Sequence, residues 1–239
     1  MPRLHRVIAL LVLLLPLAVA AQPRVAVGAD GQPLRISGRI ALIEPDIELS
    51  LVTAGGLREP RREWSDSARR LFPEATRRLL AESGRAEGHP VELPDDLDPA
   101  SQVGQIVRLN QAVALSIAAY SMPGSQLATK GRQLDWSLGR GVTALREQTG
   151  ADYGLFVYIR DSYASTGRKA LRVFGILAGA AMGSYLDIGG GQQLGVATLV
   201  DLRNGQVVWF NLMSNSSGDL RDAVGADKTV RQMLDGLPL

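Results

Sequence analysis

The side chains of this chain that could do chemistry are few, and they do not complete a known catalytic set. Only His5 and His89 are histidines, and cysteine is absent. A Ser-His-Asp hydrolase would have to use His89, but no Gly-x-Ser-x-Gly elbow supplies the nucleophile. A zinc site needs three or four nitrogen or sulfur ligands, which His89 alone cannot provide. The sequence therefore indicates no metal and no cofactor, and we interpret His89 as a surface histidine.

Two other patterns that are typical of enzymes are incomplete. Residues 189–191 are three glycines, but neither a Lys-Ser/Thr pair nor a helix start follows them, so a phosphate-binding loop is not favoured. Asp152 and Asp161 bracket an expected strand, yet no carboxylate pair is marked out for acid–base work. An exported hydrolase that uses carboxylates or Ser165 at the end of the strand over 152–160 is kept as an alternative.

A polar turn follows that strand and is the first candidate binding site. Arg160 and Asp161 end the strand, and Arg168 and Lys169 come a few residues later. Polar side chains at the carboxyl end of a strand often line sites in α/β proteins. The cations at 168 and 169 could meet an anion such as a phospholipid headgroup or a glycan polymer. The alternative is a turn with ordinary surface salt bridges, which contribute little to stability.

Residues 171–191 are the most unusual stretch, because they are apolar and rich in glycine. Gly175, Gly179 and Gly183 recur every four residues beside Phe174, so a helix would place the glycines on one smooth face that another helix can approach closely. The apolar run over 171–182 is too short to cross a bilayer as a helix. Three arrangements stay open: a β-hairpin contributed by several subunits, a segment lying in a membrane interface, or packing on the protein's own sheet. If the stretch is exposed, we expect it to contact a partner or a membrane.

The first twenty residues indicate where the protein works. Arg3 and Arg6 precede an apolar run and then small residues, which is typical of a signal peptide cleaved between Ala20 and Ala21. The chain lacks the cysteine that carries the lipid of bacterial lipoproteins. The pattern therefore predicts a periplasmic protein of a Gram-negative bacterium with neither lipid anchor nor disulfides. Without Arg3 and Arg6, 24 basic side chains face 24 acidic ones, which argues against nucleic-acid binding.

The rest of the pattern predicts one mixed α/β domain over 38–239 after a flexible leader over 21–37. Asn204-Gly205 joins two of the expected strands and favours a hairpin with a type I′ turn. A helix should begin at Ser65 and kink or break at Pro73. The fold class is α+β (mixed α/β), with one mixed sheet of about five strands flanked by three to four helices. Strands are expected over 39–45, 46–52, 152–160, 194–202 and 206–212, and helices over 65–84, 101–121, 135–148 and 228–234.

Two segments resemble parts of a known group of envelope proteins. The segment Leu199-Val-Asp-Leu-Arg-Asn-Gly-Gln-Val-Val-Trp209 resembles the V-D-x-x-T-G-x-x-x-W hairpin of proteins related to the curli-secretion lipoprotein CsgG, the penicillin-binding-protein activator lipoproteins and the TolB amino-terminal domain. The strand over 39–45, which leads through a loop to a helix, is similar to how those domains begin. The resemblance implies a small mixed sheet flanked by helices that works by protein–protein contact without catalysis. CsgG-type proteins also extend apolar hairpins to build a membrane pore, and 171–191 lies where such an insertion would fall.

We therefore predict an exported, non-catalytic cell-envelope module for binding or assembly, with an envelope protein as partner. The alternatives are the hydrolase, or an oligomeric protein that associates peripherally with a membrane through 171–191. The predicted contact surface is the sheet edge together with that segment. Because Trp209 and Phe210 alternate along a strand, one is expected in the core and the other outward. The candidate contact residues are Arg160, Asp161, Arg168, Lys169, Phe174, Gly175, Gly179, Gly183, Trp209 and Phe210.

Overall fold

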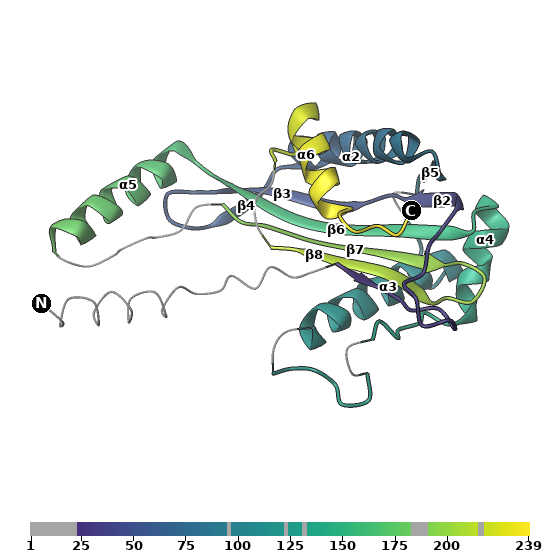
Figure 1. Ribbon diagram of the computed structural model, residues 1–239. Helices are drawn as coiled ribbons and strands as arrows, with labels where there is room; N and C mark the ends of the chain where they lie inside the picture. Colours follow the sequence, from purple (N-terminus) through teal and green to yellow (C-terminus); the bar gives the residue numbers. More distant parts are fainter. Residues whose placement is uncertain (1–22, 95–96, 122–123, 131–132, 183–190, 215–217) are drawn as a thin grey trace, which may run out of the picture.

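A mixed, open sheet runs through the molecule, with helices on both of its faces (Figure 1). The computed structural model describes residues 23–94, 97–121, 124–130, 133–182, 191–214 and 218–239. The predicted signal peptide with its cleavage site at Ala20 and Ala21 lies outside the described residues, as does Gly183. The predicted mixed α/β class is confirmed.

Eight strands form this sheet in the described residues, against about five predicted. They are β1 (Arg24–Val25), β2 (Gly38–Ile43), β3 (Asp46–Val52), β4 (Arg58–Pro60), β5 (Ala86–Val91), β6 (Tyr153–Ala164), β7 (Gln193–Asp201) and β8 (Val207–Met213). Their order is β1-β8-β7-β6-β2-β5, and β3 pairs with the second half of β6 and with β4. The unpredicted strands β1, β4 and β5 are short edge strands without the alternation that identifies a strand in a sequence.

Five α-helices are described, against three to four predicted. Helices α2 (Arg62–Ser83) and α6 (Ala223–Met233) cover one face of the sheet. The other face is covered in part by α3 (Gln102–Tyr120), the 3₁₀ turn η1 (Arg140–Val142) and α4 (Thr143–Thr149). Helix α5 (Thr166–Ala181) covers neither face and stands away from the end of the sheet (Figure 1).

The two faces of the sheet hold two separate apolar cores, and neighbouring residues of one strand serve different cores. On β6, Leu155 packs with α2 and α6, whereas Phe156 packs with α3 and α4. Trp209 and Phe210 divide in the same way and are 0% and 2% exposed. The prediction that one of these two points outward is therefore wrong, because helices cover both faces at this place.

The predicted flexible leader is also wrong from Pro23 onward. Strand β1 pairs antiparallel with β8, where Arg24 lies opposite Phe210. Ala26 and Ile36 are buried in the two cores. The glycines and prolines of this segment led to the prediction of a flexible leader. Its backbone hydrogen bonds instead cover the edge of β8, and its apolar side chains complete the cores.

Two predicted helices have different bounds in the structure. Helix α2 begins at Arg62, and Pro73 lies within it without breaking it. Ser65 is therefore not the N-cap; its buried hydroxyl accepts a hydrogen bond from the Leu49 N–H at 2.9 Å and ties α2 to β3. The helix predicted over 135–148 shortens to α4 and η1, because Gly139 has a φ of 73° that is incompatible with a helix.

The turn between β7 and β8 is wider than the predicted type I′ turn. Gly205 has a φ of 82°, but Asn204 does not share its positive φ, as a type I′ turn requires. The Gly205 N–H instead donates to the Asp201 carbonyl at 2.7 Å and closes a longer loop. The prediction of the hairpin is confirmed, and that of its turn type is wrong.

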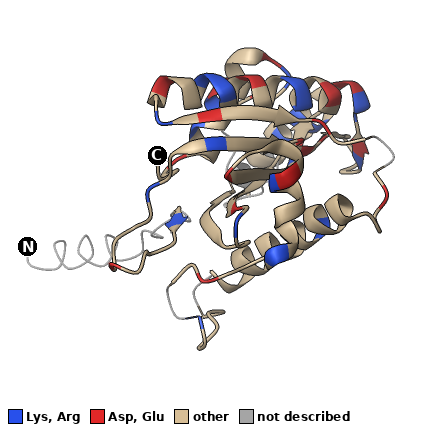
Figure 2. Ribbon diagram, turned by 90° about the vertical axis from the view of Figure 1, so that its right-hand side faces the viewer, with Lys and Arg blue, Asp and Glu red and all other residues tan. Residues whose placement is uncertain are grey.

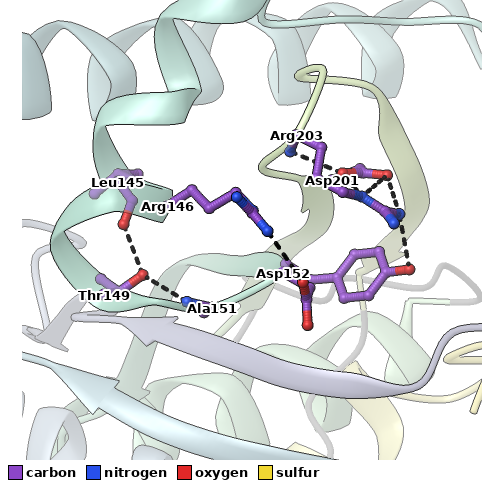
Figure 3. A network of polar contacts seen from close by, with 8 residues as sticks. Leu145, Arg146, Thr149, Ala151, Asp152, Asp201 and Arg203 are labelled. Carbon is purple, nitrogen blue, oxygen red and sulfur yellow. Dashed lines mark hydrogen bonds and ion pairs between the residues drawn. The ribbon is translucent and has the colours of Figure 1, made fainter.

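A set of polar contacts fixes this turn to the beginning of β6 (Figure 3). The Arg203 guanidinium donates to the Asp201 carboxylate at 2.6 Å and to the Tyr153 hydroxyl at 3.4 Å. Arg146 of α4 pairs with Asp152 at 3.8 Å. The guanidinium–carboxylate contact with Asp201 raises the pKa of Arg203, so this cation stays charged at every physiological pH. The turn, α4 and β6 are thereby held together at one end of the sheet.

Helix α3 is joined to the sheet by one buried polar pair. The Asn110 amide donates to the Thr198 hydroxyl at 2.8 Å, and that hydroxyl donates back to the Asn110 carbonyl oxygen at 3.2 Å. Both side chains are almost fully buried. Each group satisfies the other, so the pair fixes the position of α3 on β7.

We expect Thr198→Val to lower the free energy of unfolding by about 1–3 kcal/mol, because it leaves the buried Asn110 amide without its partner. The double variant Asn110→Leu with Thr198→Val should recover most of this loss, since it removes both polar groups together. Urea unfolding of the wild type, both single variants and the double variant measures the coupling. Additive losses would show that the pair does not act as a unit.

Candidate interaction site at helix α5

Helix α5 begins where β6 outruns its neighbour β7. The pairing of the two strands stops at Asp161 and Gln193, while β6 continues to Ala164 beside β3. The next residue, Ser165, donates its N–H to the Val52 carbonyl of β3 at 2.9 Å. Its hydroxyl accepts the Arg168 N–H at 3.1 Å, as an N-cap side chain does. The start of α5 is thus anchored to the sheet.

The rest of α5 carries large apolar side chains that are left exposed. Phe174 is 69% exposed and Leu177 is 65% exposed, and Leu171, Val173 and, just after the helix, Met182 are exposed as well. Among the described helices and strands, α5 packs substantially only against β6. The predicted alternative of packing on the protein's own sheet is therefore not what the structure shows (Figure 1). None of the described helices combines the length and apolar character needed to cross a membrane.

The beginning of α5 is basic. Arg168, Lys169 and Arg172 lie in its first two turns, and the helix contains neither aspartate nor glutamate. Lys169 and Arg172 line a shallow pocket together with Asp161. The helix therefore has a cationic foot near the sheet and an apolar remainder beyond it. Gly175 and Gly179 lie in that remainder.

The sheet end below α5 is fixed by a cluster that sequence reasoning missed. The Arg221 guanidinium lies over the rings of Tyr163 and Trp64, at 4.0 and 4.7 Å from their centroids. The rings of Tyr163 and Trp64 themselves meet edge to face at 5.8 Å. These three residues join β6, α2 and the segment before α6. Extended alternation along β6 could have indicated that Tyr163 faces inward, but nothing local identifies Trp64 and Arg221 as its neighbours.

Asp161 is the buried carboxylate of this cluster. It accepts a hydrogen bond from the Gln193 amide at 2.9 Å and another from the Tyr163 hydroxyl. Removal from water raises the pKa of Asp161 above its ordinary value, and the hydrogen bonds offset part of that effect. In contrast, Arg221 lowers the pKa of the neighbouring Asp219 by donating hydrogen bonds to it.

The structure separates the predicted contact residues into three places. Asp161 faces α2 and α6, but its neighbour Arg160 lies on the opposite face, because side chains alternate along a strand. There Arg160 donates to both carboxylate oxygens of Asp46, at 2.9 and 3.0 Å, and stacks on Tyr158. The α5 residues from Arg168 to Gly179 lie together, whereas Trp209 and Phe210 are core residues.

Ser165, which the hydrolase alternative would use, has a structural role at the start of α5. The hydroxyl of Ser165 is used as the cap of α5, and the described residues place no base within hydrogen-bond reach of it. His89 lies on the edge strand β5, at the opposite end of the sheet from α5 (Figure 1). A serine nucleophile needs a base beside it.

Comparisons with known proteins give no family and only distant structural likeness. No family model matches the chain, and no curated protein matches it. Among solved structures, the PelC dodecamer from Paraburkholderia phytofirmans is similar at 13% identity and a TM-score of 0.39, covering 91% of this chain and 97% of that one. Lipoprotein GNA1162 from Neisseria meningitidis is similar at 16% identity and a TM-score of 0.31, covering 75% and 81%. At such TM-scores no function follows, so the function is inferred from this chain's own surfaces.

We expect Asp161→Asn to change how stability depends on pH. A carboxyl whose pKa is raised by folding favours the folded state most at low pH, and this contribution is lost as the pH rises through the folded pKa. The free energy of unfolding of the variant should therefore increase relative to the wild type as the pH rises above 3.8, the ordinary value. Urea unfolding between pH 4 and pH 8 measures it, with the exposed Asp235→Asn as control. A difference that is independent of pH would contradict the burial effect.

Proposed function

We propose that this chain is an exported cell-envelope protein that works by contact with another macromolecule, and that α5 is its contact element. The exposed apolar remainder of α5 is the observation that carries the proposal. Soluble monomers rarely expose contiguous apolar patches larger than about a few hundred Å². Patches above that size mark sites of contact with a protein or a membrane. On α5 these side chains follow one another along a helix that projects from the sheet, which makes them accessible to a partner (Figure 1).

The free energy gained by burying the exposed side chains of α5 is large enough to support binding of a partner. Burial of an exposed phenylalanine or leucine side chain contributes about 1.5–3 kcal/mol. Phe174 and Leu177 are each about two-thirds exposed. Burial of either side chain by a partner would therefore increase the binding affinity several-fold. Lys169 is exposed at the foot of α5 and favours a partner or surface that carries negative charge.

Export is the second part of the proposal and rests on the amino-terminal pattern. The basic residues, the apolar run and the small residues at 18–21 together fit a cleaved signal peptide. Strand β1 starts at Arg24, so cleavage before Ala21 would leave the folded sheet intact. The absence of cysteine suits an oxidising compartment and leaves no residue for a lipid anchor.

The amino terminus of the protein purified from its native host tests export directly. We expect it to begin at Ala21, as measured by amino-terminal sequencing or intact mass, and we expect the protein in the periplasmic extract. A chain that retains Met1 and is recovered from the cytosol would refute this part of the proposal.

Photo-crosslinking in intact cells tests the contact. A photo-reactive amino acid at position 174 should capture a protein or lipid, whereas the same group at position 224 should not. Val224 is a matched control, because it is 81% exposed but lies on α6, away from α5. Phe174→Glu with Leu177→Glu should weaken the captured association about tenfold or more, and Val224→Glu should leave it unchanged. Equal labelling from both positions would remove α5 as the contact element.

A further inference from the structure

A pocket lies between the loop that follows β1 and the turn that joins β7 to β8. The loop over 27–36 forms one wall, and the turn that begins at Asp201 forms the other. The volume of the pocket is about 280 Å³. Sites for small ligands typically measure about 300–1,000 Å³, so this pocket suits a ligand at the small end of that range. It lies at the α4 end of the sheet, opposite α5, and is separate from the proposed contact element (Figure 1).

Two guanidinium groups and one carboxylate belong to the lining of this pocket. They are those of Arg35, Arg203 and Asp201. Arg203 occupies the Asp201 carboxylate with three donors (Figure 3): its backbone N–H at 2.9 Å, its Nε at 2.9 Å and its Nη2 at 2.6 Å. The carboxylate therefore has little capacity left to accept a hydrogen bond from a ligand.

Arg35 carries a positive charge that the chain leaves uncompensated. Its side chain is exposed, and within the described part of the chain it has no hydrogen-bond or ion-pair partner. Two nearby carboxylates lie outside the lining and are otherwise engaged. Asp30 accepts the Gln32 N–H at 3.0 Å, and Asp152 pairs with Arg146 at 3.8 Å. Two guanidinium groups and one carboxylate thus leave the lining with one positive charge.

The neutral polar groups of the lining add hydrogen-bond donors. The Tyr153 hydroxyl accepts from Arg203 Nη2 at 3.4 Å, so its own proton is left to donate. Removal from water raises the pKa of Tyr153 above its ordinary value, so the hydroxyl keeps this proton at neutral pH. The Asn204 side-chain oxygen accepts the Gln206 N–H at 2.9 Å, which leaves the Asn204 amide group to donate. A lining rich in donors suits a ligand whose oxygens only accept.

The remaining wall of the pocket is apolar. Val27 is exposed there, Leu34 is half-buried and Val208 is buried. Ligand sites typically combine such an apolar wall with a few polar groups that fix the orientation of the ligand. A ligand that is held at one end by its charge can therefore place its carbon skeleton against these side chains.

We infer that this pocket binds a small organic carboxylate, with Arg35 and the Tyr153 hydroxyl holding its charged group and with Val27 and Leu34 contacting its carbon skeleton. A guanidinium binds a carboxylate through two parallel hydrogen bonds, which are stronger than bonds between neutral groups. The single negative charge of a carboxylate matches the one uncompensated positive charge. A phosphate monoester carries about 1.5 to 2 negative charges at neutral pH and matches it less well. This inference goes beyond the contact proposed for α5 and does not depend on it.

Three compounds that share a phenyl ring test the inference by NMR titration of the isotope-labelled exported protein. Benzoate should shift the resonances of Arg35, Asn204 and Gln206 saturably and leave those of α2 and α6 unchanged. The neutral benzamide should bind about tenfold or more weakly, because it lacks the charge. Equal binding of benzamide, tighter binding of phenyl phosphate, or shifts spread over the arginines of α2 would each overturn the inference.

Variants separate this pocket from general attraction between charges. Arg35→Gln should weaken benzoate binding about tenfold or more, and since Arg35 is exposed the fold should be unaffected. Lys228→Gln removes an exposed cation from α6 and should leave the affinity unchanged. Tyr153→Phe keeps the ring and removes the hydroxyl, so it should weaken benzoate binding several-fold and leave benzamide binding as it was. An affinity for benzoate that is the same in Arg35→Gln as in the wild type would overturn the inference.

Discussion

The overrun of β6 beyond β7 is the constraint on which the rest of the structure depends. Ten of the twelve residues of β6 pair with β2 or β3 on one side, and these pairs run to Ala164, whereas the nine pairs with β7 on the other side stop at Asp161. The chain must therefore leave the sheet at its end instead of turning directly into the antiparallel neighbour. The buried Asp161 and the stacked Arg221, Tyr163 and Trp64 hold this end in place. A firmly held foot is what allows α5 to project as a defined element.

The helices on the two faces of the sheet differ in how many charged side chains they present to solvent. Helices α2 and α6 cover one face and meet solvent with charged side chains, including the ion pairs Arg78–Asp227 and Arg231–Glu82. Exposed pairs of this kind contribute little to stability, but they keep a surface hydrated. Helix α3 on the other face is almost uncharged, since Arg108 is its one charged residue (Figure 2). The proposed contact with another macromolecule uses α5, whose exposed side chains are mostly apolar.

Local sequence pattern predicted the elements whose residues are repeated at a regular spacing, and failed where pairing with distant strands decides the outcome. Alternation identified β3, the Asn204-Gly205 pair identified the β7–β8 hairpin, and helical spacing identified α3. The segment at Arg24 became a strand only because β8 offers an edge, and Phe210 became buried only because α3 covers its face. The opposite orientations of Arg160 and Asp161 followed from strand alternation and were predictable. Their separate partners, Asp46 and Gln193, come from other strands and were not.

The composition of α5 supports its role as an element that is stabilised by contact. Isolated helices of fewer than about 12–15 residues are marginal in water even when alanine-rich, and α5 is scarcely longer at 16 residues. It also contains Gly167, Gly175 and Gly179, each of which weakens a helix by about 1 kcal/mol relative to alanine. Tertiary packing usually offsets such losses, yet among the described helices and strands α5 packs substantially only against β6. In the proposed role, a partner surface that covers Phe174 and Leu177 would supply this packing, and the glycines would let that surface approach the helix backbone closely.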